Sequence, residues 1–241
     1  MKFIFSLLLV TVLRGAFAQP ILPDSVFYSR SVAGATEAYR KEVRENLHIY
    51  NGAAYLRTGH GIKGTPFFAA DSLLPGAAFY DNHLYGNLLL QYDMVADQVI
   101  IGNYAQQNQL QLVPEKLAWF SLAQHVFVRI AADSSLPSFM ATGFYERLYW
   151  GNMTVLARHQ KIPRQAVSAA ENEGHYETYH SYFVLLNDVF YQVSGKSDFL
   201  SLMGSAKEAA ARYIRENNIN FKKEKEAAMV RMAAWYTQLK Q

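Results

Sequence analysis

The stretch YERLYWGNMTVLARH, residues 145–159, contains two short alternating segments separated by Gly151-Asn152. A type II′ turn at these two residues pairs Trp150 with Met153 and Leu148 with Val155 on one face of a hairpin. The other face then carries Arg147, Tyr149, Thr154 and Arg158. Because one face is apolar and the other polar, this stretch predicts an antiparallel sheet that covers a core with a single face.

Two further hairpins lie on either side of this stretch. Asp81-Asn82, within residues 73–92, supplies a two-residue turn that pairs Phe79 with Leu84. Asn187-Asp188, within residues 181–193, pairs Leu185 with Phe190 and Val184 with Tyr191 in the same way. More candidate strands are Val99 to Tyr104, Leu110 to Val113, Leu117 to Leu122 and Val126 to Ile130. The spacing predicts nine or ten strands between residues 47 and 193.

Helical patterns are found before and after this β-rich part. Thr36 to Asn46 has a solvated face with charges four residues apart, which is typical of an exposed helix. Residues 196–241 predict three helices. Ser197 or Asp198 caps the first, which runs to Met203, and Ser205 with Glu208 forms a capping box for the second, which runs to Asn217. The third begins near Lys223 and carries an apolar stripe at Met232, Trp235, Tyr236 and Leu239.

Together these patterns predict an α+β fold. We expect a curved antiparallel β-meander, half-barrel or sandwich-like, with an N-terminal helix and a C-terminal helical segment. The β-rich part is residues 47–193, and the helical tail is residues 196–241.

Composition narrows the classes of function. The 241 residues are 51% hydrophobic, with 23 Lys and Arg, 20 Asp and Glu, and no Cys. Without Lys2 and Arg14, which lie in the export signal described next, 21 basic residues face 20 acidic ones. This balance argues against a nucleic-acid partner, which needs a basic surface for phosphate contacts. The lack of Cys excludes thiol catalysis, thiolate metal sites and disulfides.

The N-terminal residues have the pattern of an export signal. Lys2 precedes an apolar run at residues 3–13, and Ala16-Phe17-Ala18 matches the small-x-small pattern of a cleavage site. We expect a signal peptide at residues 1–18 and a single mature domain at residues 19–241, located in the periplasm, on the outer cell surface or in the medium. A membrane-spanning helix needs about 20 apolar residues, so we expect no transmembrane segment in the mature chain.

Several segments carry a pattern found in one group of proteins. The run YDNHLYGNLLLQYD, residues 80–93, is followed by Asp97-Gln98-Val99. Similar segments lie at residues 49–52, 64–68, 143–149 and 213–223. The chain resembles uncharacterised exported proteins of Gram-negative bacteria in these segments. The resemblance implies an exported, β-rich protein with a helical tail, and it implies no catalytic residue.

Candidate site residues are few. His175, Glu177 and His180, in the run HYETYH, are the candidate metal ligands, because imidazole and carboxylate groups bind Zn²⁺. In a strand, however, His180 points away from the other two, and in a helix Glu177 and His180 are neighbours while His175 lies away from them. Asp93 and Asp97 are separated by three residues, which is typical of a turn. No Gly-x-Ser-x-Gly motif occurs. We therefore expect no catalytic residue, cofactor or bound metal.

The sequence favours a non-enzymatic exported protein with a binding or structural accessory role. The chain has 16 Tyr, and exposed tyrosines suit contact with an envelope protein, a glycan or a lipid. One alternative is a carrier of a small apolar ligand in a β-cup lined by Leu88, Leu90 and Ile101. Another is a hydrolase with an unfamiliar site. A cleft that gathers two or more carboxylates or histidines would favour the hydrolase.

Overall fold

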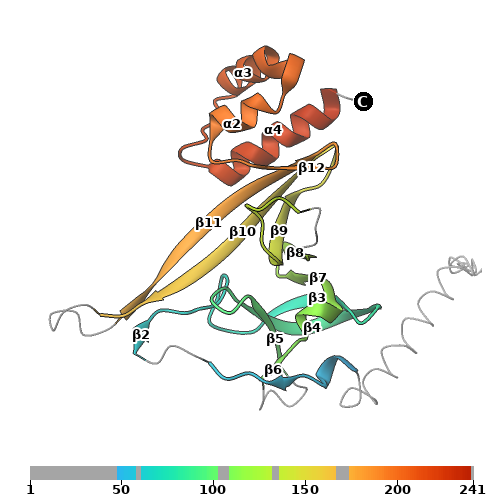
Figure 1. The fold of residues 1–241 in the computed structure, drawn as a ribbon, viewed down its shortest axis with the longest axis vertical. Helices are drawn as coiled ribbons and strands as arrows, with labels where there is room; N and C mark the ends of the chain where they lie inside the picture. The colour runs from blue at the N-terminus through green and yellow to red at the C-terminus, as the bar shows by residue number, and fades with distance from the viewer. Residues whose placement is uncertain (1–47, 58–60, 103–108, 132–135, 167–173, 240–241) are drawn as a thin grey trace, which may run out of the picture. The chain divides into compact units, whose positions relative to one another are not determined.

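A single curled sheet runs through the computed structural model, which describes residues 48–57, 61–102, 109–131, 136–166 and 174–239 (Figure 1). Contacts divide the chain into Met1–Arg44, which lies outside the described residues, and Glu45–Gln241. All described residues belong to the second part. The predicted helix from Thr36 to Asn46 and the predicted signal peptide lie outside the described residues.

The strand bounds are β1 Ala53–Ala54, β2 Ile62–Lys63, β3 Leu74–Tyr80, β4 His83–Asp93, β5 Gln98–Gly102, β6 Gln109–Gln111, β7 Leu117–Leu122, β8 His125–Ile130, β9 Gly143–Tyr149, β10 Met153–Arg164, β11 Gly174–Leu186 and β12 Val189–Gln192. The helices are α2 Lys196–Ser201, α3 Lys207–Glu216 and α4 Lys225–Leu239, with short 3₁₀ turns at His48–Tyr50, Pro114–Lys116 and Gly204–Ala206. The predicted α+β class is confirmed for the described part of the chain.

The described strands form one 12-stranded sheet in the order β1-β6-β5-β4-β3-β7-β8-β9-β10-β11-β12. Every pairing along this path is antiparallel, and only β2 joins in parallel, beside the start of β11. From β7 to β12 each strand pairs with the next one in the chain, as in a meander. The structure thus contains two to three more strands than the spacing predicted.

Two of the three predicted hairpin turns are confirmed in detail. Asp81 and Asn82 have φ values of 50° and 61°, and Phe79 pairs with Leu84. Asn187 and Asp188 have φ values of 51° and 61°, and β11 meets β12 in the predicted register. Positive φ at both central residues is the type I′ geometry, which Asn and Asp tolerate.

The prediction for residues 145–159 is wrong near the turn. Tyr149, not Leu148, lies opposite Val155, because a bulge shifts the register between Val155 and Leu156. Trp150 is 70% exposed instead of facing the core. Both faces of β10 are covered here, since Thr154 and Leu156 are buried as well as Val155. The expected polar face is therefore half-buried at Arg147, Tyr149 and Arg158 and buried at Thr154.

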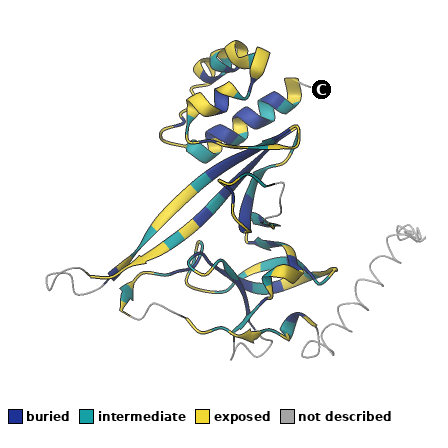
Figure 2. Ribbon diagram, in the orientation of Figure 1, coloured by how far each residue is buried: buried dark blue, intermediate teal, exposed yellow. Residues whose placement is uncertain are grey.

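The two covered faces of β10 belong to different apolar clusters. Met153 and Val155 pack with buried residues of α3 and α4, whereas Leu156 packs with Met140, Tyr145 and Phe183 on the other side. Figure 2 shows that β10 and β11 are buried where they approach the helices and exposed further along. The strand is thus sandwiched at one end, which the alternation of residues 145–159 did not indicate.

A third cluster fills the curl of β3 to β9 with aromatic rings. Phe120 and Phe127 stack with ring centres 4.8 Å apart, and Tyr92 packs against both. Leu88, Leu90 and Ile101 are buried in this same cluster. The residues predicted to line a ligand cup are therefore part of a packed core.

The helical tail follows the prediction in outline but not at its caps. Gly195 is the N-cap of α2, and α3 begins at Lys207 after a 3₁₀ turn, with no side-chain cap at Ala206. The predicted Ser205 capping box is thus wrong. In α4, Met232 and Tyr236 of the predicted stripe are buried, while Leu239 is 53% exposed. No helix in the described ranges is long and apolar enough to cross a membrane.

Candidate metal centre

A row of four titratable side chains crosses one face of the sheet, one from each of four neighbouring strands. His125 comes from β8, Glu146 from β9, His159 from β10 and His180 from β11. Glu146 pairs with Phe127 and with Ala157, so His125 and His159 lie two residues along, on the same face as Glu146. His159 pairs directly with His180. The register of the sheet thus brings together residues that are far apart in sequence.

These four side chains form a continuous hydrogen-bonded chain. Both carboxylate oxygens of Glu146 are engaged, one with His125 Nδ1 at 2.6 Å and the other with His159 Nε2 at 2.7 Å. On its other side, His159 Nδ1 lies 2.6 Å from His180 Nδ1. His159 and Glu146 are buried, while the His125 side chain is 42% exposed. The ring of Phe68 packs against His125 and His159 and shields the inner part of the chain.

The surroundings favour a carboxylate at Glu146 and a neutral imidazole at His180. Burial raises the pKa of Glu146, but the hydrogen bonds from His159 and His125 outweigh it and hold this pKa below its ordinary value. Partial burial, and to a smaller extent the nearby His159, lowers the pKa of His180.

The tautomer of a neutral His159 follows from its hydrogen bond to Glu146. An ionised carboxylate can only accept hydrogen bonds, so His159 donates its Nε2–H to Glu146. The Nδ1 atom of a neutral His159 then carries a lone pair, and His180 donates to it. The lone pair on His159 Nδ1 thus points towards His180 and away from Glu146.

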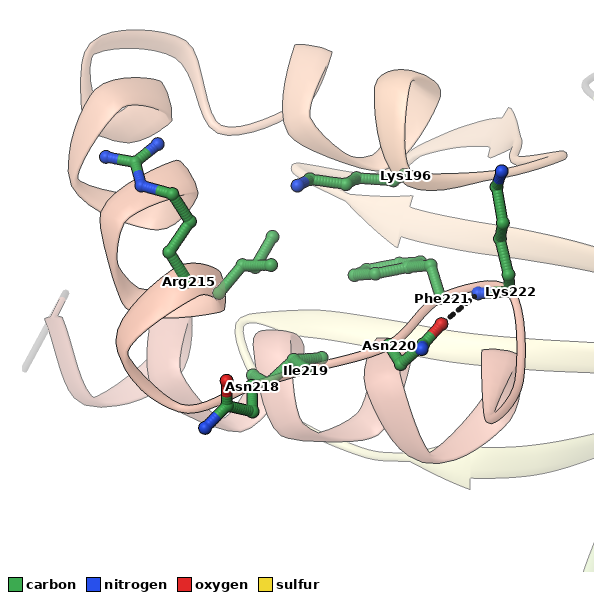
Figure 3. A pocket seen from close by; sticks show the side chains of 8 residues that line it. Lys196, Arg215, Asn218, Ile219, Asn220, Phe221 and Lys222 are labelled. Carbon is green, nitrogen blue, oxygen red and sulfur yellow. Dashed lines mark hydrogen bonds between the residues drawn. The ribbon is translucent and has the colours of Figure 1, made fainter.

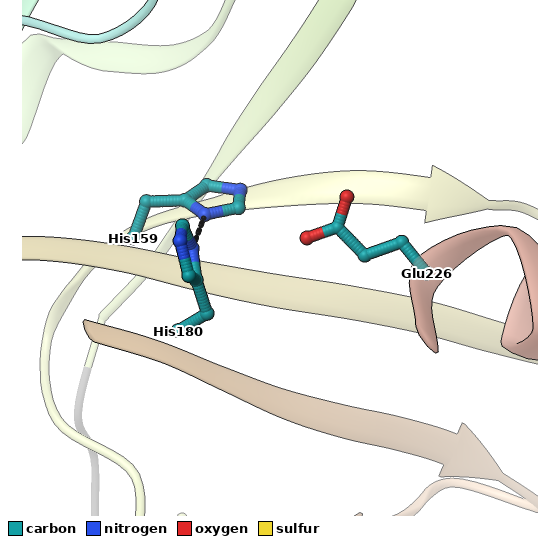
Figure 4. Close-up of side chains that lie close together, drawn as sticks. All are labelled: His159, His180 and Glu226. Atoms are coloured by element: carbon teal, nitrogen blue, oxygen red, sulfur yellow. Dashed lines mark hydrogen bonds between the residues drawn. The ribbon is translucent and has the colours of Figure 1, made fainter. Parts of the chain in front are cut away.

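A third potential ligand comes from the helical tail. Glu226, in the first turn of α4, brings its carboxylate beside the two imidazoles. Figure 4 shows His159, His180 and Glu226 converging from two strands and a helix. One ligand atom from each lies within 4.8 Å of the others, and this is the one such group in the described parts of the chain. Tyr182 Oη donates to Glu226 Oε1 at 3.0 Å, which steadies the carboxylate.

The dimensions of this group suit a tetrahedral zinc ion. Zinc binds imidazole nitrogen and carboxylate oxygen at about 2.0–2.2 Å, so two ligand atoms on one ion lie roughly 3.4 Å apart. The two Nδ1 atoms, now joined by a hydrogen bond of 2.6 Å, would separate by less than about 1 Å, and the Glu226 carboxylate would move inward by up to about 1.4 Å. His180 is exposed and Glu226 is half-buried, so both can make these shifts.

The structure places the three candidate metal ligands of the sequence analysis in different surroundings. His180 belongs to the group just described, but Glu177 accepts a hydrogen bond from Arg164 Nε at 2.8 Å. His175 lies opposite Arg164, at the far end of the β10–β11 pairing. The stretch is part of β11, so His180 points away from the other two, as expected for a strand. Of the three, the structure brings only His180 to a possible metal ligand set.

Asp93 and Asp97 occupy the turn between β4 and β5, as predicted. Asp93 Oδ1 accepts hydrogen bonds from the backbone N–H groups of Val95 at 2.8 Å and Ala96 at 3.0 Å. Its other oxygen accepts a hydrogen bond from Tyr55 Oη at 2.7 Å. Asp97 accepts one from Tyr92 Oη at 2.7 Å. Both carboxylates are thus occupied in holding the turn and the neighbouring strands.

His159, Glu146 and Glu226 were missed by the sequence analysis. Pairing residues 153–164 with residues 174–186, both of strand character, would have put His159 opposite His180. No local pattern links Glu226 to either histidine, because its position depends on how α4 packs on the sheet.

Comparison with known proteins adds no family to this description. No protein-family model, curated protein or solved structure matches the chain. The resemblance to uncharacterised exported proteins of Gram-negative bacteria therefore stays a prediction.

Proposed function

We propose that this chain is an exported, non-enzymatic binding protein that holds a divalent transition-metal ion, Zn²⁺ being the best match, at His159, His180 and Glu226. The observation that carries the proposal is the convergence of two imidazoles and a carboxylate from β10, β11 and α4 on one point. The expected signal at residues 1–18 supports the exported location.

The choice of ion follows from the donor atoms. Imidazole is a good ligand for Zn²⁺, Cu²⁺ and Ni²⁺, whereas Mg²⁺ and Ca²⁺ prefer sites built from oxygen alone. Two nitrogens and one carboxylate oxygen are one of the known ligand sets for zinc.

The contacts behind His159 support the same proposal. Histidines that bind metals usually donate their second ring N–H to a carboxylate, which fixes the orientation of the ring. Glu146 stands in this relation to His159, and His125 in turn bonds Glu146. A buried, hydrogen-bonded carboxylate thus aims His159 Nδ1 at the proposed ion.

A hydrolase is the second candidate, because the site gathers the histidines and carboxylates that this hypothesis requires. Three protein ligands also leave one position of a zinc ion for water, as in catalytic zinc sites. Glu146, however, has both oxygens bonded to histidines on the far side of His159, so it does not face the ion as a general base. Hydrolysis of a simple activated ester by the zinc-loaded chain, lost in His180→Ala, would favour this candidate over a binding role.

Isothermal titration with Zn²⁺ tests the proposal. We expect one ion per chain, with the affinity falling at least about 10-fold in His180→Ala and in Glu226→Gln, since each variant removes one ligand. His175→Ala and Glu177→Gln are matched controls on the same strand and should bind zinc like the unmodified chain. Unchanged affinity in the first two variants, or equal loss in all four, would contradict the proposal.

A further inference from the structure

Glu226, one of the three proposed metal ligands, lines a hollow on the surface of the described chain. Glu226 and Tyr182 line this hollow, which has a volume of about 440 Å³, together with Lys222, Lys223, Glu224, Lys225 and Ala227. This volume is within the range of small-molecule sites. The carboxylate of Glu226 is thus shared by the proposed metal site and the hollow.

Lysines dominate the charge around the hollow. Lys222 and Lys223 are exposed, and Lys225 is half-buried with its Nζ 5.4 Å from the centre of the Tyr182 ring. Within the described ranges, none of the three forms an ion pair. A bound divalent ion and three lysines face only two carboxylates, Glu224 and Glu226, so the hollow holds an excess of positive charge.

A larger hollow of about 630 Å³ adjoins the first and extends the positive surface. Lys222 lines both hollows. Figure 3 shows Lys196 and Arg215 around the larger one. Ile214, Ile219 and Phe221 form its buried apolar floor, and no carboxylate lines it. An organic anion anchored at the ion would find further cations and an apolar surface here.

We propose that a small anionic molecule binds in the hollow beside Glu226, with a carboxylate or phosphate oxygen in the remaining coordination position of the metal ion. This inference rests on the proposed metal binding and adds the class of ligand that the loaded site accepts. Without such an anion, a water molecule would fill this coordination position of the metal ion. The lysines attract the anion, and its oxygen completes a four-coordinate ion.

Cobalt provides a direct test, because Co²⁺ can replace Zn²⁺ in such sites and its visible absorption changes with its ligands. The full chain is loaded with Co²⁺ and titrated separately with acetate and with inorganic phosphate. We expect at least one anion to cause a saturable change in the Co²⁺ bands. The anion that binds more tightly identifies the preferred group, carboxylate or phosphate.

The double variant Lys222→Gln/Lys223→Gln should weaken the binding of that anion at least about fivefold, because two nearby cations are lost. Both lysines are exposed, so we expect this double variant to fold like the unmodified chain. Lys207→Gln/Arg231→Gln removes the same charge from exposed positions of α3 and α4 that do not line the hollow, and should leave anion binding unchanged.

The outcomes separate the two proposals. If Co²⁺ binds but neither anion changes its spectrum, or the two double variants bind the anion with equal affinity, the proposed anion site is wrong and the proposed metal site is supported. If Co²⁺ does not bind, the proposed metal-binding function is wrong, and the anion site that depends on it is wrong too.

Discussion

Glu146 is the residue that orients the proposed metal site without touching the ion. Its two oxygens hold His125 and His159, and it is buried with a side chain only 8% exposed. We expect Glu146→Gln to lower zinc affinity about 10–100-fold while one ion per chain still binds, since the three ligands remain. The measurement is isothermal titration with Zn²⁺.

The control for Glu146→Gln is Glu115→Gln, which makes the same change at a carboxylate that is 72% exposed. Its zinc affinity should equal that of the unmodified chain. Equal affinity in both variants would show that Glu146 does not position His159.

Tyr55 makes the free energy of unfolding depend on pH in the alkaline range. Burial, together with its hydrogen bond to Asp93, raises the pKa of Tyr55 above its ordinary value of 10.0. The folded chain holds this proton more tightly than the unfolded chain, so the stabilisation is complete below pH 10 and is lost as the pH rises above 10. Urea unfolding at pH 8–11.5 should show this decline in the free energy of unfolding.

Tyr55→Phe separates this contribution from the rest of the chain. The variant loses the hydrogen bond to buried Asp93 and should be less stable by about 1–2 kcal/mol at pH 8. Its free energy of unfolding should fall less steeply above pH 10 than that of the unmodified chain. Parallel curves for the two proteins would contradict this account of Tyr55.

At the scale of elements, the β11–β12 turn depends on left-handed backbone at Asn187, where φ is 51°. Asn187→Ala should lower the free energy of unfolding by about 1 kcal/mol, because Cβ strains this conformation in residues other than Gly, Asn and Asp. Asn187→Gly should cost much less, since glycine adopts positive φ freely. Denaturant unfolding of both variants measures the difference, and equal values would argue against a type I′ turn.

The packing of α4 on the sheet can be tested within one helix. Met232 is fully buried among residues of β10 and β11, so Met232→Ala should destabilise the chain by about 2–5 kcal/mol. Leu239, near the end of α4, is 53% exposed, and Leu239→Ala should change stability by less than about 0.5 kcal/mol. Thermal and denaturant unfolding provide the comparison. Small effects from both changes would mean that α4 does not pack on the sheet as described.

Local elements could be predicted where neighbours in sequence decide the structure. The turns at Asp81-Asn82 and Asn187-Asp188 were correct because each needs only two residues that tolerate positive φ. The pairing predicted after Tyr149 was wrong because a bulge shifts the register between Val155 and Leu156, where both faces of β10 are covered. Local patterning cannot show a second covered face.

On the scale of the whole molecule, the sequence predicted the α+β class but neither the strand order nor the contacts among the proposed metal ligands. Alternation with period 2 reveals strands and their faces, whereas strand order depends on contacts across the sheet, such as that of β3 with β7. His180 was a predicted candidate, but its partners His159 and Glu226 come from an adjacent strand and a distant helix. Only the pairing of β10 with β11 and the packing of α4 on the sheet bring these ligands together.

Crystals of the chain grown with Zn²⁺, measured on both sides of the zinc absorption edge, test the proposed site most directly. We predict one strong anomalous peak about 2.0–2.2 Å from His159 Nδ1, His180 Nδ1 and a carboxylate oxygen of Glu226. A peak at His175 and Glu177 instead would contradict the proposed site. A fully occupied zinc ion that contacts none of the three proposed ligands would also contradict it.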